Sequence, residues 1–353
     1  MKIKNYLFLI ALITSISNHL IGQNFITVWD LSKNGSANNS ISIGGSSTGS
    51  VNYKWKEISP GNDSGSGSFV SNQLLFTGLP SNAIIRLEIE PTNFLNISIS
   101  NSDDKDRLID IEQWGTTAWT SMNRAFYGCR NLQISATDIP DLSLVTDMSN
   151  MFRDCEKLNT PSNINSWNTA NVKNMSYLFT NAYDFNQNLS NWNTSQVTNF
   201  SNMFVGAFKF NQDIGNWNTS NATNMSNMFV LANEFNQNLG SWDVSKVTNM
   251  LGMFKNTMKF NNGDVNTIKN WNVSSARDMQ QMFFQAVSFN QNIGSWPLNS
   301  GGVDLRNMLD FSGIDCQNYS STLISWNNNQ NTPNNIFLGA NGISFASNAT
   351  LDR

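Results

Sequence analysis

The stretch VTNFSNMFVGAFKFNQDIGNW, residues 197–217, recurs with small changes along more than half of the chain. The residue after its methionine, Phe204, recurs at steps of 25 to 29 residues. The equivalent residues are Phe126, Phe152, Phe179, Phe204, Phe229, Phe254, Phe283 and Leu309. The closing tryptophan recurs at Trp167, Trp192, Trp217, Trp242, Trp271 and Trp296. A near-constant period of about 25 residues is typical of a solenoid in which each repeat forms one coil, and we expect about eight coils.

Within a repeat the apolar residues predict a short helix followed by a strand. Met148, Met151, Phe152 and Cys155 stand at i, i+3, i+4 and i+7, which is the spacing of one helix face. The threonine that follows the valine position is suited to cap such a helix. These threonines are Thr146, Thr198, Thr223 and Thr248. With a short strand expected around residues 214–218, the predicted fold class is α/β.

One coil cannot bury enough apolar surface alone, so neighbouring coils must cover it. Like residues then form columns, and we expect the tryptophan column to fill the core instead of forming a sugar-stacking platform. Cys129 and Cys155 share one column, where we expect buried free thiols. The recurring asparagines are expected to hold turns through side-chain-to-backbone bonds. A threonine ladder at Thr169, Thr194 and Thr219 gives weak support for an ice-binding face.

The segment before the repeats differs in texture. Residues 84–90 and 95–99 alternate apolar and polar side chains between clusters of Ser and Gly, as half-buried strands do. We therefore expect a small all-β, sandwich-like module over residues 24–107. The acidic residues 101–107 are expected to form a solvated linker, because the ligand spacing of a calcium loop is missing.

Composition and charge exclude several classes of function. Only 13% of residues are charged and the formal net charge is −4, so a nucleic-acid partner is not expected. The single histidine, His19, falls in a predicted signal peptide over residues 1–23, which excludes hydrolases that use histidine and His-ligated metal sites from the mature chain. We expect export to the cell surface or the medium, no membrane span in the mature chain and no cofactor.

The repeat unit resembles the surface-protein repeat of BspA-like proteins of the leucine-rich-repeat type. Residues 111–129, with Ile111-Glu112-Gln113-Trp114-Gly115 at their start, are similar to the lead-in of that group. The resemblance implies a leucine-rich-repeat-like solenoid, here over residues 108–326, on an exported protein that acts in adhesion. Residues 327–353 are then expected to form an atypical, truncated C-terminal cap.

These expectations favour a non-enzymatic protein that binds an extracellular protein or glycan through one face of the solenoid. The candidate face consists of exposed polar positions next to the tryptophan column. Its residues are Asn188, Asn191, Asp213, Asn216, Asn238, Ser241, Asn292 and Ser295.

Two alternatives remain open at this stage. A glycan-degrading enzyme would need two facing carboxylates, for which Asp213, Glu234 and Asp243 are scattered candidates. A purely structural surface spacer is the other alternative. The ligand, the mode of surface anchoring and the oligomeric state do not follow from the sequence.

Overall fold

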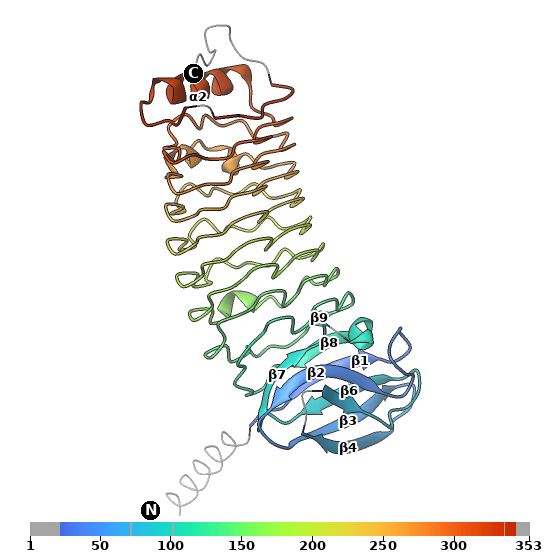
Figure 1. The fold of residues 1–353 in the computed structure, drawn as a ribbon. Coiled ribbons are helices and arrows are strands. Elements are labelled where there is room, and N and C mark those ends of the chain that lie inside the picture. Colours follow the sequence, from blue (N-terminus) through green and yellow to red (C-terminus); the bar gives the residue numbers. More distant parts are fainter. Residues whose placement is uncertain (1–21, 71–72, 101, 335, 344–353) are drawn as a thin grey trace, which may run out of the picture.

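The structure is a computed structural model that describes residues 22–70, 73–100, 102–334 and 336–343. The molecule is elongated, with two β-sheets at one end, a stack of repeats in the middle and helix α2 (Cys316–Asn328) at the other end (Figure 1). The predicted signal peptide, apart from its last two residues, lies outside the described residues, as do residues 344–353 of the predicted cap.

The N-terminal part forms two sheets packed against each other. Its strands are β1 (Phe25–Asp30), β2 (Ile41–Ser47), β3 (Val51–Ser59), β4 (Ser64–Phe69), β5 (Gln73–Phe76), β6 (Ile84–Ile89), β7 (Phe94–Ser98), β8 (Leu108–Gln113) and β9 (Gln133–Ile134). One sheet has the order β4-β3-β6-β1-β8-β9 and the other β5-β2-β7. Aromatic rings join them, with Phe25 of β1 6.3 Å from Phe94 of β7 and Tyr53 of β3 4.7 Å from Phe76 of β5, between ring centroids.

The alternation in β6 explains how this sheet forms. Ile85, Leu87 and Ile89 are buried, whereas Arg86 and Glu88 between them are half-buried. A period of two places one set of side chains in the core and the other at the surface.

The same sheet continues into the repeats. β8 pairs antiparallel with β1, and β9, which lies in the first repeat, pairs in parallel with β8. Both strands follow residue 107, the predicted end of the module. The module and the repeats therefore share one sheet and one continuous apolar core.

The segment before β8 is not the solvated linker that the sequence suggested. Asp103–Arg107 forms a 3-10 helix, in which Asp104 and Arg107 pair at 2.8 Å with at most 1% of either residue exposed. Asp104 also accepts hydrogen bonds from the N–H groups of Ser36 and Ser42, and Arg107 donates to the carbonyls of residues 33, 37 and 40. The pair fastens the loop between β1 and β2 to the start of β8.

The prediction of an α/β fold with a leucine-rich-repeat-like solenoid is wrong. The structure is β-rich, and within the described residues α2 is the only α-helix. The repeats hold neither the predicted helix nor the predicted strand at residues 214–218, and the only regular helical pieces inside them are single 3-10 turns. These turns are η2 (Ile164–Ser166), η3 (Asn262–Asp264) and η4 (Ile268–Asn270).

Backbone conformation explains the missing helix. Asn150 and Asp154 have φ values of 57° and 60°, so the chain enters the left-handed region twice within five residues. L-residues cannot extend a right-handed helix through such positions. The same pair of positions has positive φ in the following repeats, at Tyr177 and Asn181, Asn202 and Gly206, Asn227 and Leu231, Gly252 and Asn256, and Gln281 and Gln285. The helical spacing of the apolar residues is instead produced by consecutive tight turns.

Backbone N–H groups in these turns alternate between two kinds of partner. Those of Met148, Asn150 and Phe152 donate to carbonyls of the next repeat, each at 3.0 Å. Those of Met151 and Cys155 donate to the carbonyl three residues back, each at 3.2 Å. Every second residue thus bonds the repeats together, and the residues between them close turns. The predicted N-cap threonines fit this scheme, since Thr198, Thr223 and Thr248 donate to carbonyls of the preceding repeat and cap no helix.

The predicted tryptophan and phenylalanine columns are confirmed as core. Neighbouring rings in the run Phe179, Phe204, Phe229 and Phe254 are nearly parallel, 5.5 to 5.7 Å apart. The tryptophans from Trp167 to Trp296 are at most 3% exposed. The indole nitrogens of Trp192, Trp217, Trp242, Trp271 and Trp296 donate to carbonyls of the preceding repeat at 2.8 to 3.0 Å.

Helix α2 covers the last repeat. Asp315 is its N-cap, accepting a 2.7 Å bond from the N–H of Asn318, and Tyr319, Leu323 and Trp326 form its buried face. In the part of the chain that the structure describes, no helix has both the length and the apolar character needed to cross a bilayer.

Candidate binding surface

Asparagine and aspartate side chains close the corners of each repeat. In the repeat that begins at Asn199, the side chains of Asn199, Asp213 and Asn218 each accept the backbone N–H two residues further on, at 2.9 to 3.1 Å. Such Asx turns fold the chain sharply without help from distant residues. The abundance of asparagine is therefore explained largely by the architecture.

Four residues of the predicted face belong to one of these corner positions. Asn188, Asp213, Asn238 and Asn292 each accept an N–H two residues on, at 2.8 to 2.9 Å. The first three are exposed and Asn292 is half-buried. The structure brings them together as a column, but one side-chain oxygen of each is already used to close a turn.

The other four residues of that face connect neighbouring repeats. The side chains of Asn216, Ser241 and Ser295 donate to carbonyls of the preceding repeat. Asn191 is linked to the preceding repeat through its backbone N–H, which donates to Asn165 Oδ1 at 2.7 Å. All four are exposed. The two columns form one polar face, and much of its hydrogen-bonding capacity serves the fold.

The asparagine column expected to hold turns, at Asn186, Asn211, Asn236, Asn261 and Asn290, makes the predicted side-chain-to-backbone bonds, but these bonds join neighbouring repeats, and other asparagines close the turns. Each Oδ1 in this column accepts the N–H of the equivalent residue in the next repeat, at 2.8 to 3.1 Å. The acceptors are Asn159, Asn186, Asn211, Asn236, Asn261 and Asn290.

Two other suggestions from the sequence have clear outcomes. Thr169, Thr194 and Thr219 are at most 2% exposed and donate to carbonyls of the next repeat, so they form no ice-binding face. Cys129 and Cys155 are buried free thiols, as predicted, and burial raises the pKa of both far above the usual value.

The three acidic residues considered for catalysis have separate structural roles. Asp213 closes a turn, and Glu234 forms an ion pair with Lys259. Hydrogen bonds from the Ser245 hydroxyl and N–H hold the pKa of Asp243 below its usual value. A glycosidase acid needs a raised pKa, so this environment disfavours such a role for Asp243.

A different corner of the repeats exposes apolar side chains on five successive repeats. We call these residues the apolar edge: Tyr183, Phe208, Met258 and Val287, which share one position of the repeat, and Leu231, which lies two residues before that position in a repeat where Asn233 occupies it. Their exposed fractions are 38% for Phe208, 39% for Leu231, 44% for Met258 and 51% for Val287, and Tyr183 is half-buried. The rings of Tyr183 and Phe208 stack at 4.9 Å across neighbouring repeats.

Leu231 is held in an unfavourable conformation. Its φ is 61°, at a position that Asn181, Gly206 and Asn256 occupy in neighbouring repeats. Asparagine and glycine tolerate the left-handed region, whereas leucine there is strained by about 1–2 kcal/mol. Gln285 and Phe311 share this conformation at the equivalent position, and because Leu231 is exposed, packing in the core does not explain its strain. Such outliers often mark functional surface.

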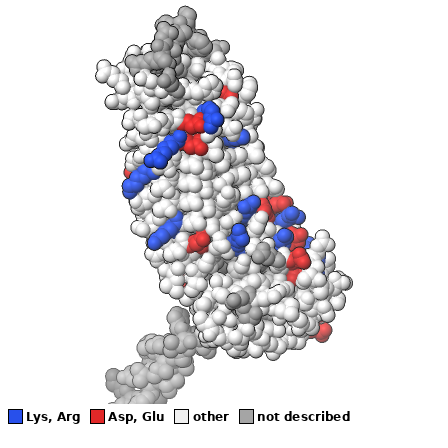
Figure 2. Space-filling model, in the orientation of Figure 1, with Lys and Arg blue, Asp and Glu red and all other residues white. Residues whose placement is uncertain are grey.

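Charges beside the apolar edge neutralise one another. Lys209 pairs with Asp184 at 2.6 Å, and Lys259 pairs with Glu234. In the face shown in Figure 2, the repeats are mostly neutral and the basic and acidic side chains lie in small mixed groups. The apolar edge is therefore flanked by charges that are paired, and a partner could contact its apolar side chains without facing an unpaired charge there.

Sequence reasoning missed the apolar edge because its residues differ from repeat to repeat. Tyr183, Phe208, Met258 and Val287 all follow a small buried residue, Ala182, Ala207, Thr257 or Ala286. That shared offset was the available signal. The same position holds Arg130, Glu156 and Asn233 in other repeats, next to a core position filled by Ala, Cys or Thr.

Comparison with known proteins identifies a repeat family. The model of the family described as "Mycoplasma protein of unknown function, DUF285" matches residues 96–213, 188–267 and 240–348, which together cover more than half of the chain. Neither the curated proteins nor the solved structures contain a match to this chain. The match supports a tandem-repeat protein of that family, and not specifically the BspA-like group that the repeat unit resembles.

Proposed function

The chain belongs to the DUF285 family of Mycoplasma proteins of unknown function, and on this premise we propose that it is an exported, non-enzymatic repeat protein that binds another protein. The binding surface in this proposal is the apolar edge. The likeness of the repeat unit to BspA-like surface proteins supports a role in adhesion, and the basic, apolar start of the chain supports export to the surface or the medium.

The observation that supports binding most directly is the row of exposed apolar side chains with a strained leucine in its middle. Protein interfaces are enriched in aromatic residues and methionine, and their centres are depleted of charge. The apolar edge has this composition, and the charges beside it are already paired. A protein partner with an apolar, uncharged contact surface fits it better than a glycan does.

The test uses the secreted full-length protein on immobilised fibronectin, collagen and laminin and on a glycan array. An apolar-edge variant combines Phe208→Ser, Leu231→Asn and Met258→Ser. The matched control combines Asn188→Asp, Asn216→Ser and Asn238→Asp on the polar face, each change placing a residue found at the equivalent position of another repeat. We expect the first variant to bind an immobilised protein at least tenfold more weakly and the control to bind within twofold of the wild type.

Several outcomes would overturn the proposal. They are the absence of binding to any immobilised protein, equal binding by the apolar-edge variant, or glycan binding that only the polar-face variant loses. Self-association of the wild type that the apolar-edge variant abolishes, seen by sedimentation, would assign the edge to a second copy of this chain instead.

Export and the absence of catalysis have their own measurements. Mass spectrometry of the released protein should find an N-terminus close to Gln23 or Asn24. Incubation with polysaccharides should release no reducing sugar. Sugar release that Asp213→Asn, Glu234→Gln or Asp243→Asn abolishes would support the enzymatic alternative.

A further inference from the structure

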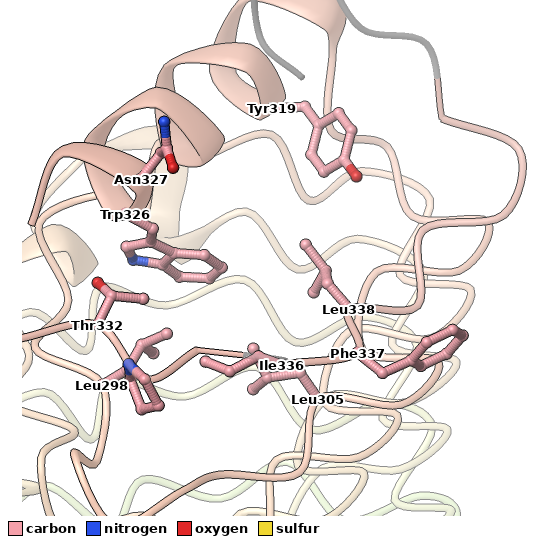
Figure 3. Close-up of a pocket in the computed structure, with 10 residues that line it drawn as sticks. Leu298, Leu305, Tyr319, Trp326, Asn327, Thr332, Ile336, Phe337 and Leu338 are labelled. Carbon is pink, nitrogen blue, oxygen red and sulfur yellow. The ribbon is translucent and has the colours of Figure 1, made fainter. Parts of the chain in front are cut away.

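A cavity of about 310 Å³ lies between helix α2 and the segment that returns beneath it (Figure 3). Its apolar walls come from the last repeats, from α2, from Pro333 and from residues 336–338. The wall residues used below are Leu298, Leu305, Tyr319, Trp326, Ile336 and Leu338. The cavity is roughly twice the size of the ~150 Å³ apolar cavity that accommodates benzene in an engineered protein.

The cavity wall also holds buried polar atoms that have no partner. Trp326 Nε1, Asn327 Oδ1 and Thr332 Oγ1 are inaccessible to solvent and make no hydrogen bond within the described residues. Trp326 as a whole is only 3% exposed. In Figure 3 its indole nitrogen lies on the side of Thr332, across the open space from Leu338. A buried donor or acceptor without a partner costs about 1–3 kcal/mol, so a ligand that supplies partners here gains by it.

Trp326 differs from the tryptophans of the five preceding repeats, although the buried indole nitrogens of Trp114, Trp119 and Trp167 also lack a partner. From Trp192 to Trp296, each indole nitrogen is bonded to a carbonyl of the preceding repeat. Trp326 keeps the buried ring but lacks the bond. The ring that carries the unused donor lines a volume large enough for a small molecule.

The chemistry of the walls restricts the ligand. Among the described residues, no charged side chain lines the cavity. Burial raises the pKa of Tyr319, which keeps its phenol neutral at ordinary pH. A charged ligand would lose its hydration without finding a counter-ion. Apolar pockets with a few converging polar groups are typical of small-molecule sites.

We propose that this cavity binds a neutral small molecule with an aromatic or branched apolar body and one hydroxyl or amide group. The apolar body lies against Leu305, Ile336 and Leu338. The polar group accepts from Trp326 Nε1 and donates to Asn327 Oδ1 or Thr332 Oγ1. This site is separate from the apolar edge and does not depend on the function proposed for that edge.

The experiment compares two matched probes, 4-fluorophenol and 4-fluorotoluene, by fluorine NMR on the full chain. Both probes fit the apolar volume, but only the phenol can use the polar atoms. We expect saturable binding of both, with the phenol bound more tightly. Trp326→Phe keeps the ring and removes the donor, so it should weaken phenol binding about fivefold and change toluene binding by less than twofold.

Filling the cavity provides the second arm. Ile336→Trp should abolish binding of both probes, and Leu338→Phe should weaken both if the first variant does not fold. Ile324→Ala, on the exposed side of α2, is the control and should leave binding unchanged. Failure of the wild type to bind either probe, or full binding by a folded cavity-filled variant, would overturn the proposal, as would equal loss of both probes in Trp326→Phe.

Discussion

The N-terminal sheets and the repeats provide hydrogen-bond partners for their backbone N–H and C=O groups in different ways. In the sheets, each strand pairs with a partner of different sequence, and a single buried ion pair, Asp104–Arg107, fastens a long loop. In the turns of the repeats, every second backbone N–H bonds to a carbonyl of the next repeat, and the same pattern of bonds recurs from one repeat to the next. We infer that stability is concentrated at a few sites in the sheets and is distributed along the repeats.

Replacing a central ring should produce the largest loss in the repeats. Phe229→Ala removes a fully buried ring that stacks on Phe204, Phe235 and Phe254. We expect a loss of about 4 kcal/mol in the free energy of unfolding, measured by urea denaturation. Hydrogen exchange should show the loss in the adjoining repeats and leave β1 and β6 protected. Phe208→Ala, on the surface, is the control and should lose less than about 1 kcal/mol.

Breaking the buried ion pair should have a comparable effect, confined to the sheets. Arg107→Met leaves Asp104 buried without its counter-charge and leaves three carbonyls without their donor. We expect a loss of about 3 kcal/mol, with increased hydrogen exchange in the loop 33–42. The exposed pair Arg306–Asp304 supplies the control, since Arg306→Met should change stability by less than about 1 kcal/mol. Equal losses from both substitutions would remove the distinction between unique and repeated contacts.

Replacing one residue of the asparagine column should cost less stability than either of the changes above. Asn236 Oδ1 accepts the N–H groups of Asn261 and Gly263 at 2.8 and 2.9 Å. Asn236→Ala leaves both donors without this acceptor, and we expect a loss of about 1–2 kcal/mol in thermal or urea unfolding. Gln196→Ala, at an exposed position, should be close to neutral.

Low pH should reduce the contribution of the N-cap residue Asp315 to the stability of helix α2. Hydrogen bonds from the N–H of Asn318 and the amide of Asn290 outweigh desolvation and hold the pKa of Asp315 below its usual value. A lowered pKa in the folded state means that this contribution is present above about pH 4 and is lost as the pH falls through the folded value. We expect Asp315→Ala to lose about 1 kcal/mol at pH 7 and less near pH 3. A difference between variant and wild type that grows on acidification would contradict the assignment.

The smallest expected effect has the opposite sign. Leu231→Asn replaces a strained residue by one that the neighbouring repeats use in the same conformation. We expect a gain of about 0.5–1 kcal/mol in stability, together with weaker binding to the protein partner. Asn256→Leu is the reciprocal change and should be destabilising. A loss of stability in Leu231→Asn would show that the leucine serves the fold and would remove its support for a binding surface.

The repeat period and the buried columns followed from the sequence because they depend on composition at fixed offsets. Trp217 and Phe204 recur too regularly to be surface residues, and both are buried. The helix did not follow, because the spacing of Met148, Met151 and Phe152 fits an α-helix and a run of tight turns equally well. Asparagine and glycine at positions such as Asn202 and Gly206 were the distinguishing signal, since they are typical of left-handed backbone.

The candidate face was harder to judge from sequence. Asn188 and Asn216 are exposed as expected, but a hydrogen bond to a turn and one to a neighbouring repeat already engage them. The sequence alone does not distinguish an asparagine whose side chain closes a turn from one whose side chain is free to bind a ligand. The apolar edge lay outside the prediction because surface positions that vary from repeat to repeat show no period.

The alternating bonds between repeats have a consequence for how such a chain can evolve. Each copy presents the same donors on one side and the same acceptors on the other, so a duplicated copy inserted in register would find every partner it requires. The four extra residues that lengthen one copy lie at a corner around η3 and η4, where they leave this pattern intact. The reach of the molecule can therefore change by whole units through duplication or deletion in the gene, while the two ends stay as they are.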